Sequence, residues 1–339
     1  MKKTELGIVS FVELTKDNKT YHERINDVLE EIKLADKLGL DFFGIGEHHR
    51  SDYAASSPLT ILAGAATITK NIKLGSAVVV LSSEDPVRLI EQYRTLNIIS
   101  NNRAELMVGR GSFIESFPLF GYDLNDYNEL FEEKFELLNL LNKEDNLTWQ
   151  GKYTQSLENV SIYPKIENPL TISVGVGGSR DSIIRAAKYG TPLVLAIIGG
   201  NPLFFKSFVQ MYKRLYIDFG HDPKNMHITA NFHGFVSDDN IELEMFKKAS
   251  IEQMNIIGKE RGWSKYTEVS YNRSIGLNGP LIVGNSKDVA LKMNYFIKEL
   301  ELDRILLQVT VGTLPLDMTL RTIRSLATEV KPLLINKDQ

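Results

Sequence analysis

Short apolar runs alternate with amphipathic stretches along the chain, and this order constrains the fold more than any other feature. Eight of the runs have the length and the composition of buried strands. They cover residues 6–11, 42–46, 72–81, 104–109, 170–174, 193–197, 228–235 and 304–309. Helical patterns follow them, and the count of eight predicts an α/β fold, a single (β/α)8 TIM barrel. A doubly wound open sheet is the main alternative.

Local helix-start signals agree with this pattern. Thr20 and Glu23 have the spacing of a capping box, in which each side chain accepts a hydrogen bond from the other residue's backbone. Pro58 and Pro86 are suited to the first helical position, where the missing N–H has no intrahelical partner to lose. We therefore expect helices to begin at these three places.

One barrel domain is expected over residues 1–339. Two segments are longer than the usual connections of a compact domain and are predicted to be insertions, near 143–169 and near 258–279. The first contains residues suited to short extra strands, whereas the second shows no clear period.

Composition excludes several classes of function. The net charge is −4 and no basic stripe is present, so nothing indicates a nucleic-acid partner. The chain has no cysteine, which excludes disulfides, thiolate catalysis and zinc–thiolate sites and fits a reducing cytoplasm. No apolar run approaches the ~20 residues of a membrane span, and the first residues do not resemble a signal peptide. We expect a cytoplasmic protein without a membrane partner.

The run 42–46 ends abruptly in the polar residues Glu47, His48, His49 and Arg50. Carboxyl ends of parallel strands carry the chemistry of α/β folds, so these residues are predicted to border an active site. Strand alternation places His48 on the glycine side of the strand, where a ligand has room. It would serve as a general base or hydrogen-bond donor with a pKa near the working pH, or as a structural histidine. Because adjacent strand residues point apart, we expect no metal at His48 and His49.

Three weaker motifs also follow predicted strands. The glycine-rich turn 175–179 suits a phosphate or is an ordinary turn. Arg110, between two glycines, would clamp a phosphate or form a salt bridge with Glu84, Glu105 or Glu115. In the run 75–80, the small residues Ser76 and Ala77 would admit a flat ligand, or the run forms a tight barrel layer. Together the motifs suit a phosphorylated planar cofactor better than a metal.

The order and spacing of several motifs resemble the luciferase-like flavin-dependent monooxygenases, whose best-known member is the bacterial luciferase α chain. The matching motifs are GEHH at 46–49, DPVR at 85–88, NRAEL at 102–106, GRG at 109–111 and FGYD at 120–123. The resemblance covers most of the chain. Gly109 stands where the luciferase α chain has a reactive cysteine, and we see no counterpart of the long luciferase lid. The resemblance therefore implies a non-luminous member.

The resemblance also implies a site and a reaction. Reduced FMN, bound at the carboxyl end of a (β/α)8 barrel, would react with O2 to oxygenate a small organic substrate. His48 would be the catalytic base. The residues implied to bind the cofactor are Ala77 and Val78, joined by a non-proline cis peptide beside the flavin ring, Leu81 against the ring, and Arg110, Gly178, Ser179 and Ser182 at the phosphate.

Electrons would come from NAD(P)H, used directly or through a partner flavin reductase. The resemblance further implies a homodimer formed through the helices near 58–69 and 86–99. Three other interpretations stay open. The first is a deazaflavin-dependent hydride-transfer oxidoreductase of the same fold. The second is a metal-dependent barrel hydrolase that uses His48 or His49 with His233, and the third is a flavin-binding protein without turnover.

Overall fold

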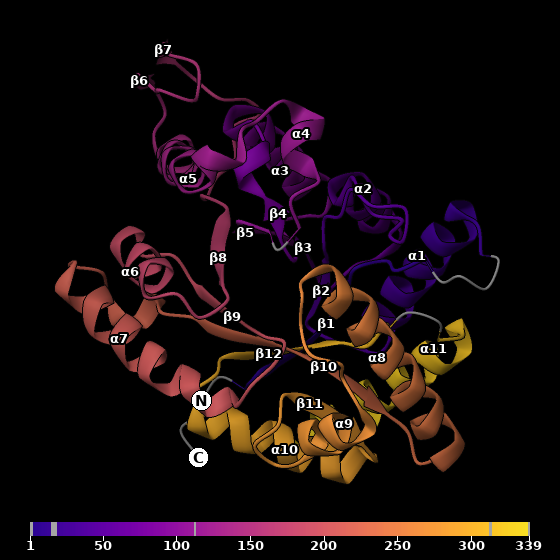
Figure 1. The fold of residues 1–339 in the computed structure, drawn as a ribbon. Helices are drawn as coiled ribbons and strands as arrows, with labels where there is room; N and C mark the ends of the chain where they lie inside the picture. The colour runs from indigo at the N-terminus through magenta and orange to yellow at the C-terminus, as the bar shows by residue number, and fades with distance from the viewer. Residues whose placement is uncertain (1–2, 15–18, 112, 312–313, 338–339) are drawn as a thin grey trace.

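Eight parallel strands close into a barrel in the computed structural model, which describes residues 3–14, 19–111, 113–311 and 314–337 (Figure 1). The barrel strands are β1 (Glu5–Ser10), β2 (Phe42–Ile45), β3 (Lys73–Ser76), β5 (Ala104–Gly109), β8 (Thr171–Val176), β9 (Leu193–Ile197), β10 (Ile228–Val236) and β12 (Arg304–Gln308). Each strand pairs with the next, and β12 pairs with β1 to complete the circle. The predicted TIM barrel is confirmed, and the open sheet is wrong.

Helices surround the barrel on its outside (Figure 1). The longer ones are α1 (Tyr21–Lys37), α2 (Pro58–Ile68), α3 (Pro86–Ile99), α5 (Tyr127–Lys143), α6 (Arg180–Tyr189), α7 (Phe205–Asp218), α8 (Asn240–Glu260), α10 (Ser286–Glu299) and α11 (Leu316–Ser325). Shorter ones are α4 (Ser116–Phe120) and α9 (Glu268–Ile275). The capping box is confirmed, since Thr20 and Glu23 accept each other's backbone N–H. Among the described residues, no helix combines the length and apolarity needed to cross a bilayer.

The structure differs from the predicted elements at a few places. The expected strand 72–81 ends at Ser76, and the peptide between Ala77 and Val78 is cis, as the resemblance implied. Only the short strand β4 (Val79–Val80) follows, and Leu81 begins a 3-10 helix. The prediction missed α4 and the strand β11 (Leu281–Gly284), which pairs with the second half of β10.

Both expected insertions contain ordered structure. In the first, β6 (Leu147–Trp149) and β7 (Leu157–Val160) form a separate antiparallel pair, so the expectation of short extra strands is confirmed with shifted bounds. The second contains α9, which lies next to α8 and β11 (Figure 1).

Side chains of β2 alternate as the sequence predicts. Phe43 and Ile45 point outward into the main core between the barrel and the helices. Phe42 points inward, where it forms a small interior cluster with Val9, Met107, Val194 and Leu306. The ring fits because β2 itself and the neighbouring strand β3 carry glycine beside it. A Cβ at Gly44 or Gly75 would lie 2.8 or 2.9 Å from a Phe42 ring atom.

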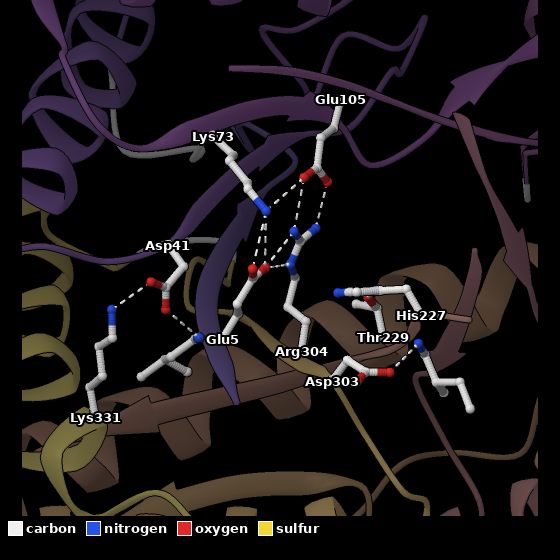
Figure 2. Close-up of polar contacts among 11 residues, drawn as sticks. Glu5, Asp41, Lys73, Glu105, His227, Thr229, Asp303, Arg304 and Lys331 are labelled. Atoms are coloured by element: carbon white, nitrogen blue, oxygen red, sulfur yellow. Dashed lines mark hydrogen bonds and ion pairs between the residues drawn. The ribbon is translucent and has the colours of Figure 1, made fainter. Parts of the chain in front are cut away.

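Charged side chains fill the amino-terminal end of the barrel (Figure 2). The guanidinium of Arg304 donates to Glu5 at 2.7 Å and to both carboxylate oxygens of Glu105 at 2.6 and 2.9 Å. Lys73 Nζ lies 3.1 Å from Glu5 and 3.2 Å from Glu105. Arg304 also stacks over Phe42, with Cζ 4.7 Å from the ring centroid. Burial raises the pKa of Glu105, but Arg304 outweighs burial and brings this pKa to about 2.

Two aspartates lie close to this cluster, and each binds the start of the strand next to the one it precedes (Figure 2). Asp41 accepts the N–H of Leu6 at 2.8 Å and pairs with Lys331 at 2.7 Å. Asp303 accepts the N–H of Ile228 at 2.9 Å. These bonds satisfy backbone donors that the barrel ladder leaves unpaired. The amino-terminal end is therefore closed by charge, which leaves the carboxyl-terminal end as the place for a ligand.

We expect Arg304→Met to destabilise the protein by about 3–5 kcal/mol, because it removes the buried guanidinium that pairs with the carboxylates of Glu5 and Glu105. The free energy of unfolding in urea measures this effect. Arg321→Met is a matched control, because Arg321 pairs with two carboxylates at the surface, and it should cost less than about 1 kcal/mol. Equal losses in the two variants would contradict the assigned role of the cluster.

Candidate functional site

A cavity of about 480 Å³, including the part open to solvent, lies at the carboxyl ends of β1, β2, β3 and β5. One part of its wall is apolar and has small side chains: Ala77, Val78, Val80 and Gly111. Ala77 and Val78 also pack on the interior cluster around Phe42. The cavity therefore sits directly on the packed interior of the barrel.

His48 lines this cavity among aromatic rings. It stacks on Tyr53 with ring centroids 4.2 Å apart, and it contacts Phe11 at 4.7 Å and Phe113 at 5.5 Å. The residue is only 8% exposed, and its Nδ1 has no hydrogen-bond partner among the residues that the structure describes. Burial lowers the pKa of His48 to about 3, with Asp52 opposing this shift. The expected pKa near the working pH is therefore wrong for this structure, and the imidazole is uncharged at neutral pH.

Glu47 fixes the loop after β2 against the cavity wall. Its carboxylate lies 2.8 Å from His49 Nε2 and accepts the backbone N–H of Val80 at 2.9 Å. His49 also lines the cavity, so the expectation that His48 and His49 point to opposite sides is wrong. The reason is that β2 ends at Ile45 and the strand alternation stops there. Within the described ranges, no group of three or more His, Cys, Asp or Glu side chains could hold a metal ion.

Arg50 joins three segments at the rim. It forms ion pairs with Asp52 in its own loop, with Glu115 after β5 and with Glu260 at the end of α8, at distances of 2.8–3.0 Å. Its guanidinium also lies over the ring of Phe113, 4.7 Å from the centroid. Arg50 thus fixes both Glu115 and Phe113, which line the cavity.

Arg110 follows β5 and turns toward α5. Its Nη1 donates to Asn128 at 2.8 Å, and its Cζ lies 5.4 Å from the ring centroid of Tyr127. The guanidinium hydrogen bond therefore goes to an amide, not to the carboxylates Glu84, Glu105 and Glu115 that the sequence offered as partners. An amide leaves the positive charge of Arg110 uncompensated, which suits an anion.

The turn between β8 and α6 contains the predicted residues Gly178, Ser179 and Ser182. Gly178 has φ +106°, which other residues rarely adopt. Ser179 caps α6, and its Oγ lies 2.6 Å from Ser182 Oγ. Arg185 lies 3.4 Å from Ser182 Oγ and also donates to Glu132 at 2.7 Å. Hydroxyl groups, backbone N–H groups and the positive end of α6 meet here.

Arg110 and Arg185 both bind to one face of α5. Asn128, the partner of Arg110, and Glu132, the partner of Arg185, are four residues apart in α5 and share a face of the helix. Arg110 and the Ser179–Ser182 turn therefore lie along the same side of α5. Neither group lines the cavity itself.

Leu81 is placed differently from the other predicted residues. It is fully buried in the main core, and its neighbour Val80 lines the cavity in its place. Sequence reasoning did not assign Val80, Phe113 or Ser116 to the site. Apolar residues at a strand end give no signal that separates cavity wall from core.

Known proteins match both the sequence and the fold. A family model described as luciferase-like monooxygenase matches residues 4–272. The alkanal monooxygenase alpha chain of Photorhabdus luminescens is 26% identical over 218 residues, which are 62% of this chain and 58% of that one. The match thus spans less than two thirds of that relative.

Solved structures share the fold over nearly the whole chain. The monooxygenase RslO1 from Streptomyces bottropensis has a TM-score of 0.85 at 22% identity and covers 97% of this chain and 99% of its own. The oxygenating constituent of 3,6-diketocamphane monooxygenase from Pseudomonas putida, solved with FMN, has a TM-score of 0.77 at 18% identity, with 98% and 99% covered. An F420-dependent secondary alcohol dehydrogenase has a TM-score of 0.78 at 17% identity, with 99% and 100% covered.

We expect the imidazole of His48 to stay uncharged down to about pH 4, because burial holds its pKa near 3. Since the proton binds more weakly in the folded state than in the unfolded state, His48 should lower stability as the pH falls below its ordinary value of 6.5. Imidazole nitrogen shifts in an NMR titration measure the charge, and His48→Gln assigns the signal. A titration midpoint near pH 6.5 would contradict this description.

Proposed function

The chain belongs to the luciferase-like monooxygenase family, and on that premise we propose that it is an FMN-dependent monooxygenase. It would use reduced FMN and O2 to oxygenate a small organic substrate. One observation carries the proposal: a cavity with a small apolar wall opens at the carboxyl end of the barrel, and anion-binding groups lie together along α5.

The residues present fit the two ends of FMN. Ala77, Val78 and Val80 would contact the flavin ring, which needs a flat apolar surface. Val78 is fixed by close packing, since a Cβ at Gly109 or Gly175 would lie 2.8 or 3.0 Å from its side chain. Leu81 would support Val80 from the core.

The phosphate of FMN would be held by the groups along α5. Arg110 supplies a guanidinium, Ser179 and Ser182 supply hydroxyl groups, and the turn at Gly178 supplies backbone N–H groups. Glu132 and Asn128 hold the arginines in place. A phosphate needs this combination of positive charge and directed donors.

Reduced FMN, when bound, would supply the electrons that activate O2 for transfer of one oxygen atom to the substrate. The residues of the chain would prepare the site for that chemistry. The uncharged imidazole of His48 can accept a proton, or give a hydrogen bond, at an atom beside its free Nδ1. The rings of Phe11, Tyr53 and Phe113 would keep water away from it.

Partners and location form part of the same proposal. NAD(P)H would reduce the flavin directly or through a flavin reductase. A homodimer would form through α2 and α3, where Ile68, Ile98 and Ile99 are 45%, 51% and 44% exposed. A cytoplasmic location would fit a chain without cysteine.

We expect the protein to bind FMN more tightly than riboflavin, because only FMN carries the phosphate. Arg110→Ala should weaken FMN binding at least about tenfold and leave riboflavin binding unchanged, since a charge-assisted hydrogen bond is lost. Flavin fluorescence titration measures both affinities. Arg214→Ala, an exposed arginine of α7, serves as the control. Unchanged FMN affinity in Arg110→Ala would contradict the phosphate assignment, and tight binding of F420 in place of FMN would favour the deazaflavin alternative.

A further inference from the structure

We propose that the part of the cavity beside His48 recognises the substrate through a hydrogen-bond donor on the substrate. The substrate class is then an alcohol or an amine carried on an apolar body, and carboxylates are rejected. This inference rests on the proposed function, because it names the substrate class of the same site.

Within the described parts of the chain, three buried polar atoms of cavity-lining residues have no hydrogen-bond partner. They are His48 Nδ1, Glu115 Oε2 and Ser116 Oγ. His48 and Ser116 are only 8% and 3% exposed. Buried polar atoms in folded proteins nearly always have a partner, so atoms left unpaired at a cavity indicate a ligand that supplies one.

Glu115 determines which kind of partner is needed. Its Oε1 accepts from Arg50 at 2.8 Å, whereas its Oε2 is buried and unpaired. A carboxylate oxygen can only accept a hydrogen bond. The ligand must therefore present an O–H or N–H group to this oxygen, with the hydroxyl of Ser116 next to it in the chain.

Among the residues that the structure describes, the cavity wall offers no free cation to an anionic substrate. Arg50 lies near, but its five N–H donors are already engaged by Asp52, Glu115 and Glu260. Of the two histidines of the wall, His49 bonds to Glu47, and burial keeps the imidazole of His48 uncharged by lowering its pKa. Arg261 stacks over Phe113 and is not part of the wall. A carboxylate placed here would meet Glu115 without a compensating charge, which is unfavourable.

The apolar part of the substrate would lie against aromatic rings. Phe11 and Phe113 line the cavity and both contact the His48 ring, at centroid distances of 4.7 and 5.5 Å. Such rings contact flat or branched apolar groups well. The rings would thus hold the apolar body of the substrate, while Glu115 accepts from its head group.

Isothermal titration with benzylamine, benzyl alcohol and benzoate tests the proposal, because these probes share one ring and differ in the head group. The titrations are run on the FMN-free and on the FMN-saturated protein. We expect benzylamine and benzyl alcohol to bind at least about tenfold more tightly than benzoate in both forms. A similar or tighter affinity for benzoate, or no binding of any probe, would overturn the proposal.

Two variants identify the acceptor. Glu115→Gln should weaken benzylamine binding at least about tenfold without weakening benzoate, and Ser116→Ala should weaken benzyl alcohol by about threefold to fivefold. Glu260→Gln is the matched control, since Glu260 also pairs with Arg50 but lies outside the wall, and it should change each affinity by less than about twofold. Equal effects of Glu115→Gln and Glu260→Gln would overturn the proposal.

A competition experiment separates substrate from cofactor. If FMN displaces the probes, the unpaired acceptors belong to the flavin and the proposal is wrong. Retention of the probe ranking with FMN bound supports it. Failure to bind FMN at all would contradict the proposed function. In that case the order of the probe affinities on the FMN-free protein would still test whether Glu115 binds a hydrogen-bond donor.

Discussion

The aromatic ring of Phe42 divides the interior of the barrel into two parts with opposite chemistry. Below the ring, Arg304 binds Glu5 and Glu105 and closes the amino-terminal end with charge. Above it, the inward positions carry small residues such as Gly44 and Ala77, and the cavity opens. Ion pairs thus fill one end of the barrel, and the cavity lies at the other end. The Phe42 ring lies between them, and it has room because Gly44 and Gly75 carry no side chain.

Much of the fold could be predicted because long-range order in the sequence reflects barrel topology. The eight apolar runs correspond to the eight barrel strands, and the start signals at Thr20, Pro58 and Pro86 mark real helices. The prediction failed where an element is short. The strand β11 has four residues and the helix α4 has five, too few to show a period. The break after Ser76 was also hidden within one apolar run.

The candidate site was predictable only in its polar parts. His48 lines the cavity, and Arg110 and the Ser179–Ser182 turn lie along one face of α5. The pKa of His48 could not be predicted, since it depends on Tyr53 and Phe113, which reach the imidazole from separate loops. Nor could the unpaired oxygen of Glu115, because the position of this carboxylate depends on Arg50, which lies far from it in the sequence.

A crystal structure of the protein soaked or co-crystallised with FMN tests the central claim most directly. The account predicts electron density for the flavin ring against Ala77, Val78 and Val80, with the phosphate between Arg110 and the amino end of α6. It also predicts that His48 stays beside the ring and that the substrate region near Glu115 stays free. A flavin bound elsewhere, or a phosphate that contacts neither Arg110 nor α6, would contradict it.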